Sequence, residues 1–167
     1  MMNSDIDVLY NKEGKFMDTN IEMIPSYKIA YIRRTGPYGS ENMQIMGQLK
    51  SWAREKNLFD ENSIIFGIAQ DNPQITEPKD CRYDTCFVVS NELKVDNTYI
   101  HFGKTAGGKY CVFKISHTAD AVQKAWTEIF PELSKRNYKF DGERPILERY
   151  AVQMVNQHFC EICVPIL

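Results

Sequence analysis

The 167-residue chain has no apolar run that approaches the ~20 residues needed to cross a lipid bilayer. Its N-terminus lacks a basic segment followed by an apolar one, so a secretory signal peptide is not indicated. We therefore expect a soluble cytoplasmic protein without a membrane partner. A basic stripe is missing too, because 20 basic and 22 acidic residues are spread along the chain and give a net charge of −2. Direct binding to nucleic acid, which needs such a stripe to neutralise phosphates, is not expected.

Common catalytic and metal motifs are also lacking. The sequence contains no G-x-S-x-G, no H-E-x-x-H and no glycine-rich phosphate loop. The three histidines, His101, His117 and His158, have no ligand spacing and are expected at the surface. The five cysteines include a C-x-x-C at Cys160 and Cys163, but residues three apart in a strand point to opposite faces. We expect free, packed thiols, no metal and no cofactor.

Hydrophobic residues make up 43% of the chain and aromatic residues 12%, which is typical of a globular domain. Residues 1–20 are polar and predict an N-terminal extension, so the domain is expected over 21–167. Strand and helix patterns then occur in the same order twice. The predicted elements are a strand at 21–33, a helix ending near 56–57, strands at 63–70 and 82–89, an added strand at 99–104, a strand at 109–116, a helix over 118–133, and strands around Glu148 and Glu161.

This order predicts an α+β fold with two β-α-β-β repeats, at about 21–90 and 107–166. The repeats would join into a mostly antiparallel sheet with two helices and a central groove, where ligands commonly bind. Pro131 lies inside the second predicted helix, so a kink or a break is expected near Phe130. A polar hairpin loop is expected at Asn156 and Gln157, between the last two strands.

Two carboxylates, Glu148 and Glu161, lie within short apolar runs near the C-terminus. An ionised carboxylate in apolar surroundings needs a cation, a hydrogen-bond donor or water. Glu148 shares its strand face with Tyr150, which favours a ligand-binding role, although exposure to water or a pairing with Arg149 or Arg144 remains an alternative. For Glu161 a salt bridge or hydrogen bond within the sheet is as well supported as contact with a ligand.

Aromatic side chains would complete a site for a flat organic cation, because stacking adds to charge attraction. Each candidate could instead belong to the core, and for Trp126, on an apolar helical stripe, packing is the favoured interpretation. The aromatic candidates for ligand contact are Tyr38, Tyr110, Trp126, Tyr150 and Phe159.

The order and spacing of several short motifs resemble the GyrI-like small-molecule-binding family, related to the effector-binding domains of AraC-type and MerR-type regulators. The resemblance covers most of 22–166. It is carried by Ile24-Pro25, Ala30 to Arg33, Gly36-Pro37-Tyr38, Asp71-Asn72-Pro73, Cys81 to Asp84, Gly107 to Tyr110, Trp126 with Ile129-Phe130-Pro131, Pro145 with Glu148 and Tyr150, and Glu161 before Pro165-Ile166.

The resemblance implies SHS2-type repeats and a groove that accepts hydrophobic, often aromatic or cationic molecules, as in multidrug binding. Glu148 matches the carboxylate associated with cationic ligands, and Glu161 matches a second acidic position. Regulators of this kind carry a helix-turn-helix domain upstream. The roughly twenty preceding residues are too few for one, so a stand-alone binding protein is expected.

Two alternatives follow from the same resemblance. The first is a hydrolase that opens cyclopropane-bearing DNA-alkylating compounds, with Glu148 as general base and Tyr150 or Glu161 as its partner. The second is an interaction with DNA gyrase, which a relative inhibits.

Overall fold

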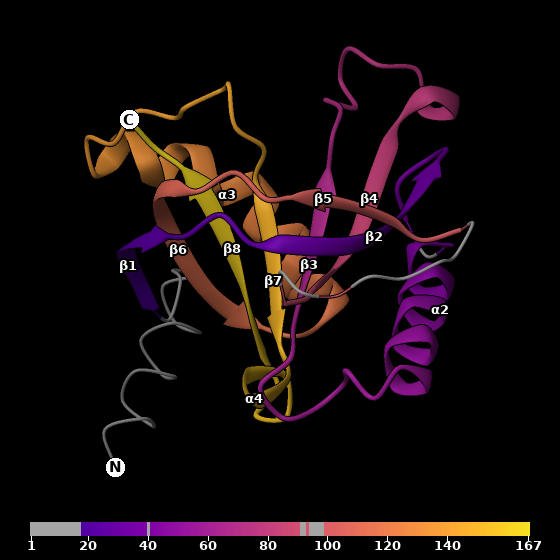
Figure 1. Ribbon diagram of the computed structural model, residues 1–167. Helices are drawn as coiled ribbons and strands as arrows, with labels where there is room; N and C mark the ends of the chain where they lie inside the picture. Colours follow the sequence, from indigo (N-terminus) through magenta and orange to yellow (C-terminus); the bar gives the residue numbers. More distant parts are fainter. Residues whose placement is uncertain (1–17, 40, 91–92, 94–98) are drawn as a thin grey trace.

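The computed structural model describes residues 18–39, 41–90, 93 and 99–167 (Figure 1). One antiparallel sheet of eight strands runs through the molecule in the order β1-β6-β8-β7-β3-β4-β2-β5. The strands are β1 (Asp18–Ile24), β2 (Lys28–Thr35), β3 (Ile64–Ala69), β4 (Arg82–Val88), β5 (His101–Lys104), β6 (Gly108–Ser116), β7 (Leu147–Ala151) and β8 (Phe159–Pro165). The helices are α2 (Glu41–Glu55), α3 (Ala119–Lys135) and the short α4 (Val152–Val155), with a 3-10 turn, η1 (Pro78–Asp80).

The predicted α+β fold of two β-α-β-β repeats is confirmed. The first repeat is β2-α2-β3-β4 and the second is β6-α3-β7-β8, and they meet where β7 pairs with β3. The expectation of a single strand over 21–33 was wrong, because Pro25 lies between β1 and β2 and cannot donate to a sheet ladder. Since β1 begins at Asp18, the predicted boundary after residue 20 falls inside a strand; residues 1–17 lie outside the described part.

Each repeat is preceded by an edge strand that pairs with the other repeat. Strand β1 leads into β2 but pairs with β6, whereas β5 leads into β6 but pairs with β2. The two connections therefore cross, and hydrogen bonds join them: Tyr27 N donates to Thr105 Oγ1 at 2.8 Å, and Thr105 N donates to Tyr27 O at 2.9 Å. A Cβ at Gly107 would lie 2.7 Å from Ser26 N, so only glycine permits this close approach.

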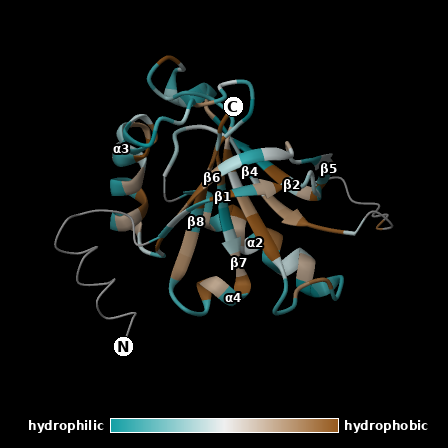
Figure 2. Cartoon of the chain, turned by 90° about the vertical axis from the view of Figure 1, so that its left-hand side faces the viewer, coloured by the Kyte–Doolittle hydropathy of each residue, from teal (hydrophilic) through white to brown (hydrophobic). Residues whose placement is uncertain are grey.

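Both long helices cover the same face of the sheet. In α3 the buried residues Ala125, Ile129 and Leu133 recur at helical spacing and pack on β6 and β8. Helix α2 buries Leu49 and Trp52 against β2, β3 and β4. Figure 2 shows hydrophobic residues on the side of α3 that faces the sheet and hydrophilic residues on its outer side.

One helix and one connection between strands differ from expectation. Helix α3 continues through Pro131, so a break near Phe130 was the wrong prediction. The proline removes one backbone donor, but the apolar stripe on both sides of it remains packed in the core. Between β7 and β8 the chain forms α4 rather than a simple hairpin loop at Asn156 and Gln157, and His158 with φ 67° leads out of this turn.

The opposite face carries a second apolar layer, beneath the crossing connections. Phe66, Tyr110, Leu147 and Cys163 are fully buried there. Cys160 packs instead on the helix-covered face, so the thiols of Cys160 and Cys163 diverge as predicted. The five cysteines are all buried and unpaired with one another, and His101, His117 and His158 are exposed as expected.

Within the described ranges, no helix combines the length and the apolar character that a bilayer crossing requires.

Candidate functional site

Glu148 lies at the centre of the sheet, where the two repeats meet. It sits on β7 directly opposite Ile162 of β8 and opposite Gly67 of β3, and Gly67 in turn lies opposite Thr85 of β4. Directly opposed residues in an antiparallel pair share a face. Ile162 packs with α3, so this row, Glu148 included, faces the helices.

Two tyrosine hydroxyls bond the Glu148 carboxylate. Tyr150 Oη donates to Oε2 at 2.5 Å, and Tyr83 Oη donates to Oε1 at 3.4 Å. Among the described residues, no lysine or arginine forms an ion pair with Glu148. Burial raises the pKa of Glu148 above its ordinary value, and the two tyrosine hydrogen bonds oppose this rise. The predicted alternative of pairing with Arg149 or Arg144 does not apply among the described residues, because both arginines form ion pairs with other carboxylates. Glu148 is half-buried and so keeps partial exposure to water.

Gly67 provides the space through which Tyr83 reaches Glu148. A Cβ at position 67 would lie 1.9 Å from Tyr83 Oη and 2.8 Å from its Cζ. The tyrosine ring thus lies across the glycine backbone, in the gap between Thr85 and Glu148. A glycine inside a buried strand commonly marks such a close approach.

We expect Gly67→Ala to push the Tyr83 hydroxyl away from Glu148. Because the ring would have to leave a well-packed position, the free energy of unfolding should fall by about 1–3 kcal/mol, as measured by urea denaturation. Gly47→Ala in α2 is the matched control, since a Cβ there meets nothing within 4 Å. The control should be neutral or slightly stabilising; equal stability of both variants would contradict the assigned role of Gly67.

Further aromatic groups extend from this centre. Tyr150 packs against the apolar clusters of both helices, and its ring meets the edge of His117 at a centroid distance of 5.5 Å. Tyr38 meets Tyr83 edge-on at 6.1 Å. Trp126 of α3 is half-buried against the cluster of its own helix. Four predicted ligand-contact residues, Glu148, Tyr150, Tyr38 and Trp126, therefore lie on the helix-covered side.

Two buried polar atoms near this centre have no hydrogen-bond partner among the described residues. They are Thr85 Oγ1 and Trp52 Nε1, in side chains that are 0% and 1% exposed. Thr85 lies in the same cross-strand row as Glu148, and its partner on β2 is Ile32. Trp52 of α2 belongs to the hydrophobic cluster that also contains Ile32. Such groups have unused hydrogen-bonding capacity.

Glu161, the second carboxylate predicted as a ligand contact, lies on the face of the sheet opposite to Glu148. Arg149 lies opposite Glu161 on the other face, because adjacent strand residues point to opposite sides. Arg149 Nε donates to Glu161 Oε1 at 2.8 Å, while Nη1 and Nη2 donate to the two carboxylate oxygens of Glu22, both at 2.9 Å. The salt-bridge interpretation of Glu161 is confirmed.

Two aromatic candidates also lie on that other face. Tyr110 is fully buried, and its hydroxyl donates to Ala106 O at 2.5 Å. Phe159 alternates with Glu161 along β8, and the Lys114 ammonium lies 4.5 Å from its ring centroid. Both side chains are therefore separated from Glu148 by the sheet.

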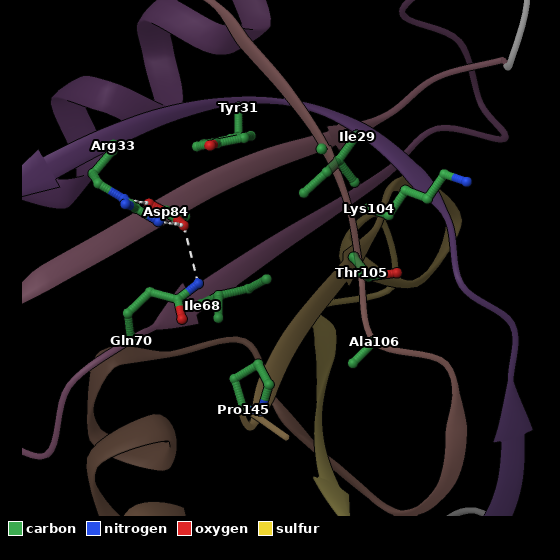
Figure 3. A pocket seen from close by; sticks show the side chains of 11 residues that line it. Ile29, Tyr31, Arg33, Ile68, Gln70, Asp84, Lys104, Thr105, Ala106 and Pro145 are labelled. Carbon is green, nitrogen blue, oxygen red and sulfur yellow. Dashed lines mark hydrogen bonds and ion pairs between the residues drawn. The ribbon is translucent and has the colours of Figure 1, made fainter. Parts of the chain in front are cut away.

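Sequence reasoning missed Tyr83, Gly67, Thr85 and Trp52. The glycine within an apolar strand was an available signal for close packing, but nothing in the sequence identifies the ring that fills the space. A cavity on the opposite face, close to Asp84 and Arg33, contains none of the predicted ligand-contact residues (Figure 3).

Comparison with known proteins relates this chain to small-molecule binding domains. The family model of the GyrI-like small molecule binding domain matches residues 17–167. The SPbeta prophage-derived putative transcriptional regulator YosT of Bacillus subtilis (strain 168) is 43% identical over 151 residues, which are 90% of this chain and 99% of that protein. A protein named DNA gyrase inhibitor from Pectobacterium carotovorum subsp. carotovorum (strain PC1) is 28% identical over 125 residues, or 73% of this chain and 79% of its own.

Solved structures share the fold at low sequence identity. The EcmrR C-terminal domain superposes with a TM-score of 0.70 at 14% identity, covering 90% of this chain and 97% of that domain. The longer EcmrR chain in its DNA complex gives the same TM-score and identity, and the match covers 99% of this chain and 64% of that one. SAV2435 bound to tetraphenylphosphonium has a TM-score of 0.56 at 15% identity, over 90% of this chain and 94% of SAV2435.

Proposed function

Because the chain belongs to the GyrI-like small molecule binding domain family, we propose that it binds hydrophobic, often aromatic organic cations, with Glu148 as the charged contact. SAV2435, which shares the fold, is described as bound to tetraphenylphosphonium, a cation of this kind. The lining that we propose consists of Tyr150, Tyr83, Tyr38 and Trp126.

The observation that supports this proposal is that Glu148 forms no ion pair with a basic side chain of the described residues. Every other buried or half-buried carboxylate of the described residues has a basic partner, and Glu148 has two phenol hydroxyls instead. The paired groups are Glu22 and Glu161 with Arg149, Asp71 with Arg82, Asp84 with Arg33, Glu128 with Lys124, Glu132 with Arg136, and Asp141 with Arg144. An unneutralised carboxylate among aromatic rings favours a positively charged guest.

The expected interaction energies favour selection of the ligand by its charge more than by its shape. A cation ~4 Å from a carboxylate gains about 4 kcal/mol at an effective dielectric of ~20, before desolvation is subtracted. Each aromatic ring in contact adds roughly 0.5–2 kcal/mol. Affinities in the micromolar range, about −8 kcal/mol, are expected for lipophilic cations of several shapes.

We expect cation binding to tighten as the pH rises through the pKa of Glu148. Only the ionised carboxylate attracts the cation, and burial places that pKa above the ordinary 4.5. In the free protein, the free energy of unfolding should fall as the pH rises from 4.5 through the raised pKa of Glu148. The reason is that this carboxyl releases its proton at a lower pH in the unfolded chain than in the folded one. Titration calorimetry with tetraphenylphosphonium between pH 5 and 8 measures the effect, and Glu148→Gln should give a flat profile.

A pH-independent affinity in the unsubstituted protein would show that Glu148 does not titrate in contact with the cation.

Hydrolysis is a second candidate function, favoured by the short hydrogen bond of 2.5 Å between Tyr150 and Glu148. A carboxylate with a raised pKa can accept a proton from water, and a phenol can donate to a leaving group. Burial raises the pKa of Tyr150 above its ordinary value, so its hydroxyl remains a donor. Incubation with a cyclopropane-bearing alkylating compound, followed by mass spectrometry, distinguishes turnover from binding alone.

Binding to DNA gyrase and the expected lack of direct binding to nucleic acid both remain predictions. An interaction with DNA gyrase is suggested by the name of the Pectobacterium relative, and the expectation of no direct nucleic-acid contact has to be weighed against the DNA complex of the longer EcmrR chain.

A further inference from the structure

We propose that the cavity on the face opposite the helices is a second ligand site, for a small aromatic or otherwise flat anion. The cavity has a volume of about 290 Å³. It lies among β2, β3, β4, the connection after β5, and Pro145 before β7 (Figure 3). Because Glu148 faces the helices, the sheet separates the two sites, and this inference does not depend on the function proposed for Glu148.

The walls of the cavity are fixed before any ligand arrives. Its floor consists of alternate residues of β2, including Ile29 and Tyr31, with Ile68 of β3. Its other side is the connection that contains Thr105 and Ala106. Thr105 is bound to the crossing connection through three hydrogen bonds, with Ser26 Oγ, Tyr27 N and Tyr27 O, at 2.6 to 2.9 Å. A preformed site avoids an ordering cost on binding.

The size and lining favour a compact, flat guest. A volume of about 290 Å³ is near the lower limit of small-molecule pockets. Ile29, Ile68, Ala106 and Pro145 supply apolar walls, and the Tyr31 ring forms an aromatic one. Gly103, opposite Ile29 on β5, leaves room for that ring, because a Cβ there would lie 3.3 Å from Tyr31 Cε1. A single substituted ring suits these dimensions.

The polar groups of the cavity have unused donors and an excess of positive charge. Asp84 is 4% exposed, and its oxygens accept from Arg33 Nε at 2.7 Å, Arg33 Nη2 at 2.8 Å and Gln70 Nε2 at 3.0 Å. Within the described residues, Arg33 Nη1 bonds no acceptor, so its two hydrogens remain available. Lys104 is a second cation, at the rim away from Arg33 (Figure 3).

Charge therefore distinguishes this site from that of Glu148. Two cations line the cavity against one carboxylate, and that carboxylate is already bonded by Arg33 and Gln70. A guest carboxylate can bond the free nitrogen of Arg33 while its ring contacts Tyr31 and the apolar walls. A cation of the same shape would be repelled by Arg33 and Lys104, and the carboxylate of Asp84 already accepts hydrogen bonds from Arg33 and Gln70.

The test compares three probes that have the same ring and different charge: benzoate, benzamide and benzamidinium. Methyl NMR spectra of the full chain should show benzoate shifting Ile29, Ile68 and Ala106, with weaker shifts for benzamide and none there for benzamidinium. Lys104→Gln should weaken benzoate binding about threefold, as expected for one exposed charge. Lys56→Gln, at an exposed position after α2, is the matched control and should leave the affinity unchanged.

A second variant, Ala106→Leu, fills the cavity without altering a charge. It should abolish benzoate binding and leave tetraphenylphosphonium binding intact, because Glu148 lies across the sheet. Equal shifts from all three probes, an absence of benzoate shifts at millimolar concentration, or unchanged affinity in both Lys104→Gln and Ala106→Leu would overturn the proposal.

Discussion

Tetraphenylphosphonium is expected to bind Glu148→Gln at least tenfold more weakly than the unsubstituted protein, a loss of about 1.4 kcal/mol or more. The amide keeps the size of the side chain and can still accept a hydrogen bond from Tyr150, so the change removes mainly the charge. Only Tyr83 and Tyr150 bond this carboxylate among the described residues, and its negative charge is therefore available to a guest. Calorimetric titration at neutral pH measures the difference.

Glu61→Gln is the control for this experiment, because Glu61 is an exposed carboxylate in the turn before β3. It changes the net charge by the same amount as Glu148→Gln and should leave the affinity unaltered. Equal losses in both variants would indicate a general effect of net charge, and no loss in either would remove Glu148 from the site.

Arg149→Met is expected to lower the free energy of unfolding by about 3–5 kcal/mol near neutral pH. The guanidinium joins three strands, since β7 carries Arg149, β8 carries Glu161 and β1 carries Glu22. Without it, two carboxylates would remain close together and unpaired, and Glu161 is only 8% exposed. Denaturation in urea, followed by circular dichroism, provides the measurement.

The pH dependence of this loss follows from the pKa of Glu22, which the hydrogen bond from Arg149 lowers. A depressed pKa contributes stability above the unfolded value of 4.5, and that contribution disappears as the pH falls through the folded pKa. The difference between Arg149→Met and the unsubstituted protein should therefore shrink in acid. Arg136→Met, which removes a more exposed pair with Glu132, should cost at most about 1 kcal/mol at any pH.

The repeat architecture could be predicted because its signals are local. The apolar stripe of α3 and the alternation in β6 each specify one element, and Gly107 and Gly108 mark the turn at which β6 begins. The exchange of edge strands could not be read in this way, since β1 pairs with β6 about ninety residues later. That pairing depends on contacts that only the assembled sheet provides.

The candidate site was predictable only in part for the same reason. The apolar context of Glu148 indicated an unusual carboxylate, and the spacing to Tyr150 correctly placed both on one face. Arg149 was considered only as a possible partner of Glu148, and its pairing with Glu161 required the register of β7 against β8. The role of Gly67 depends on a tyrosine from another strand, which no local pattern reveals.

The pKa of Glu148, followed by carbon-13 NMR of its carboxyl carbon with and without tetraphenylphosphonium, tests the central claim most directly. We predict a value above 4.5 in the free protein that falls when the cation binds, because the guest's charge stabilises the ionised form. An unchanged pKa in the saturated complex would mean that the cation lies elsewhere and would contradict the account.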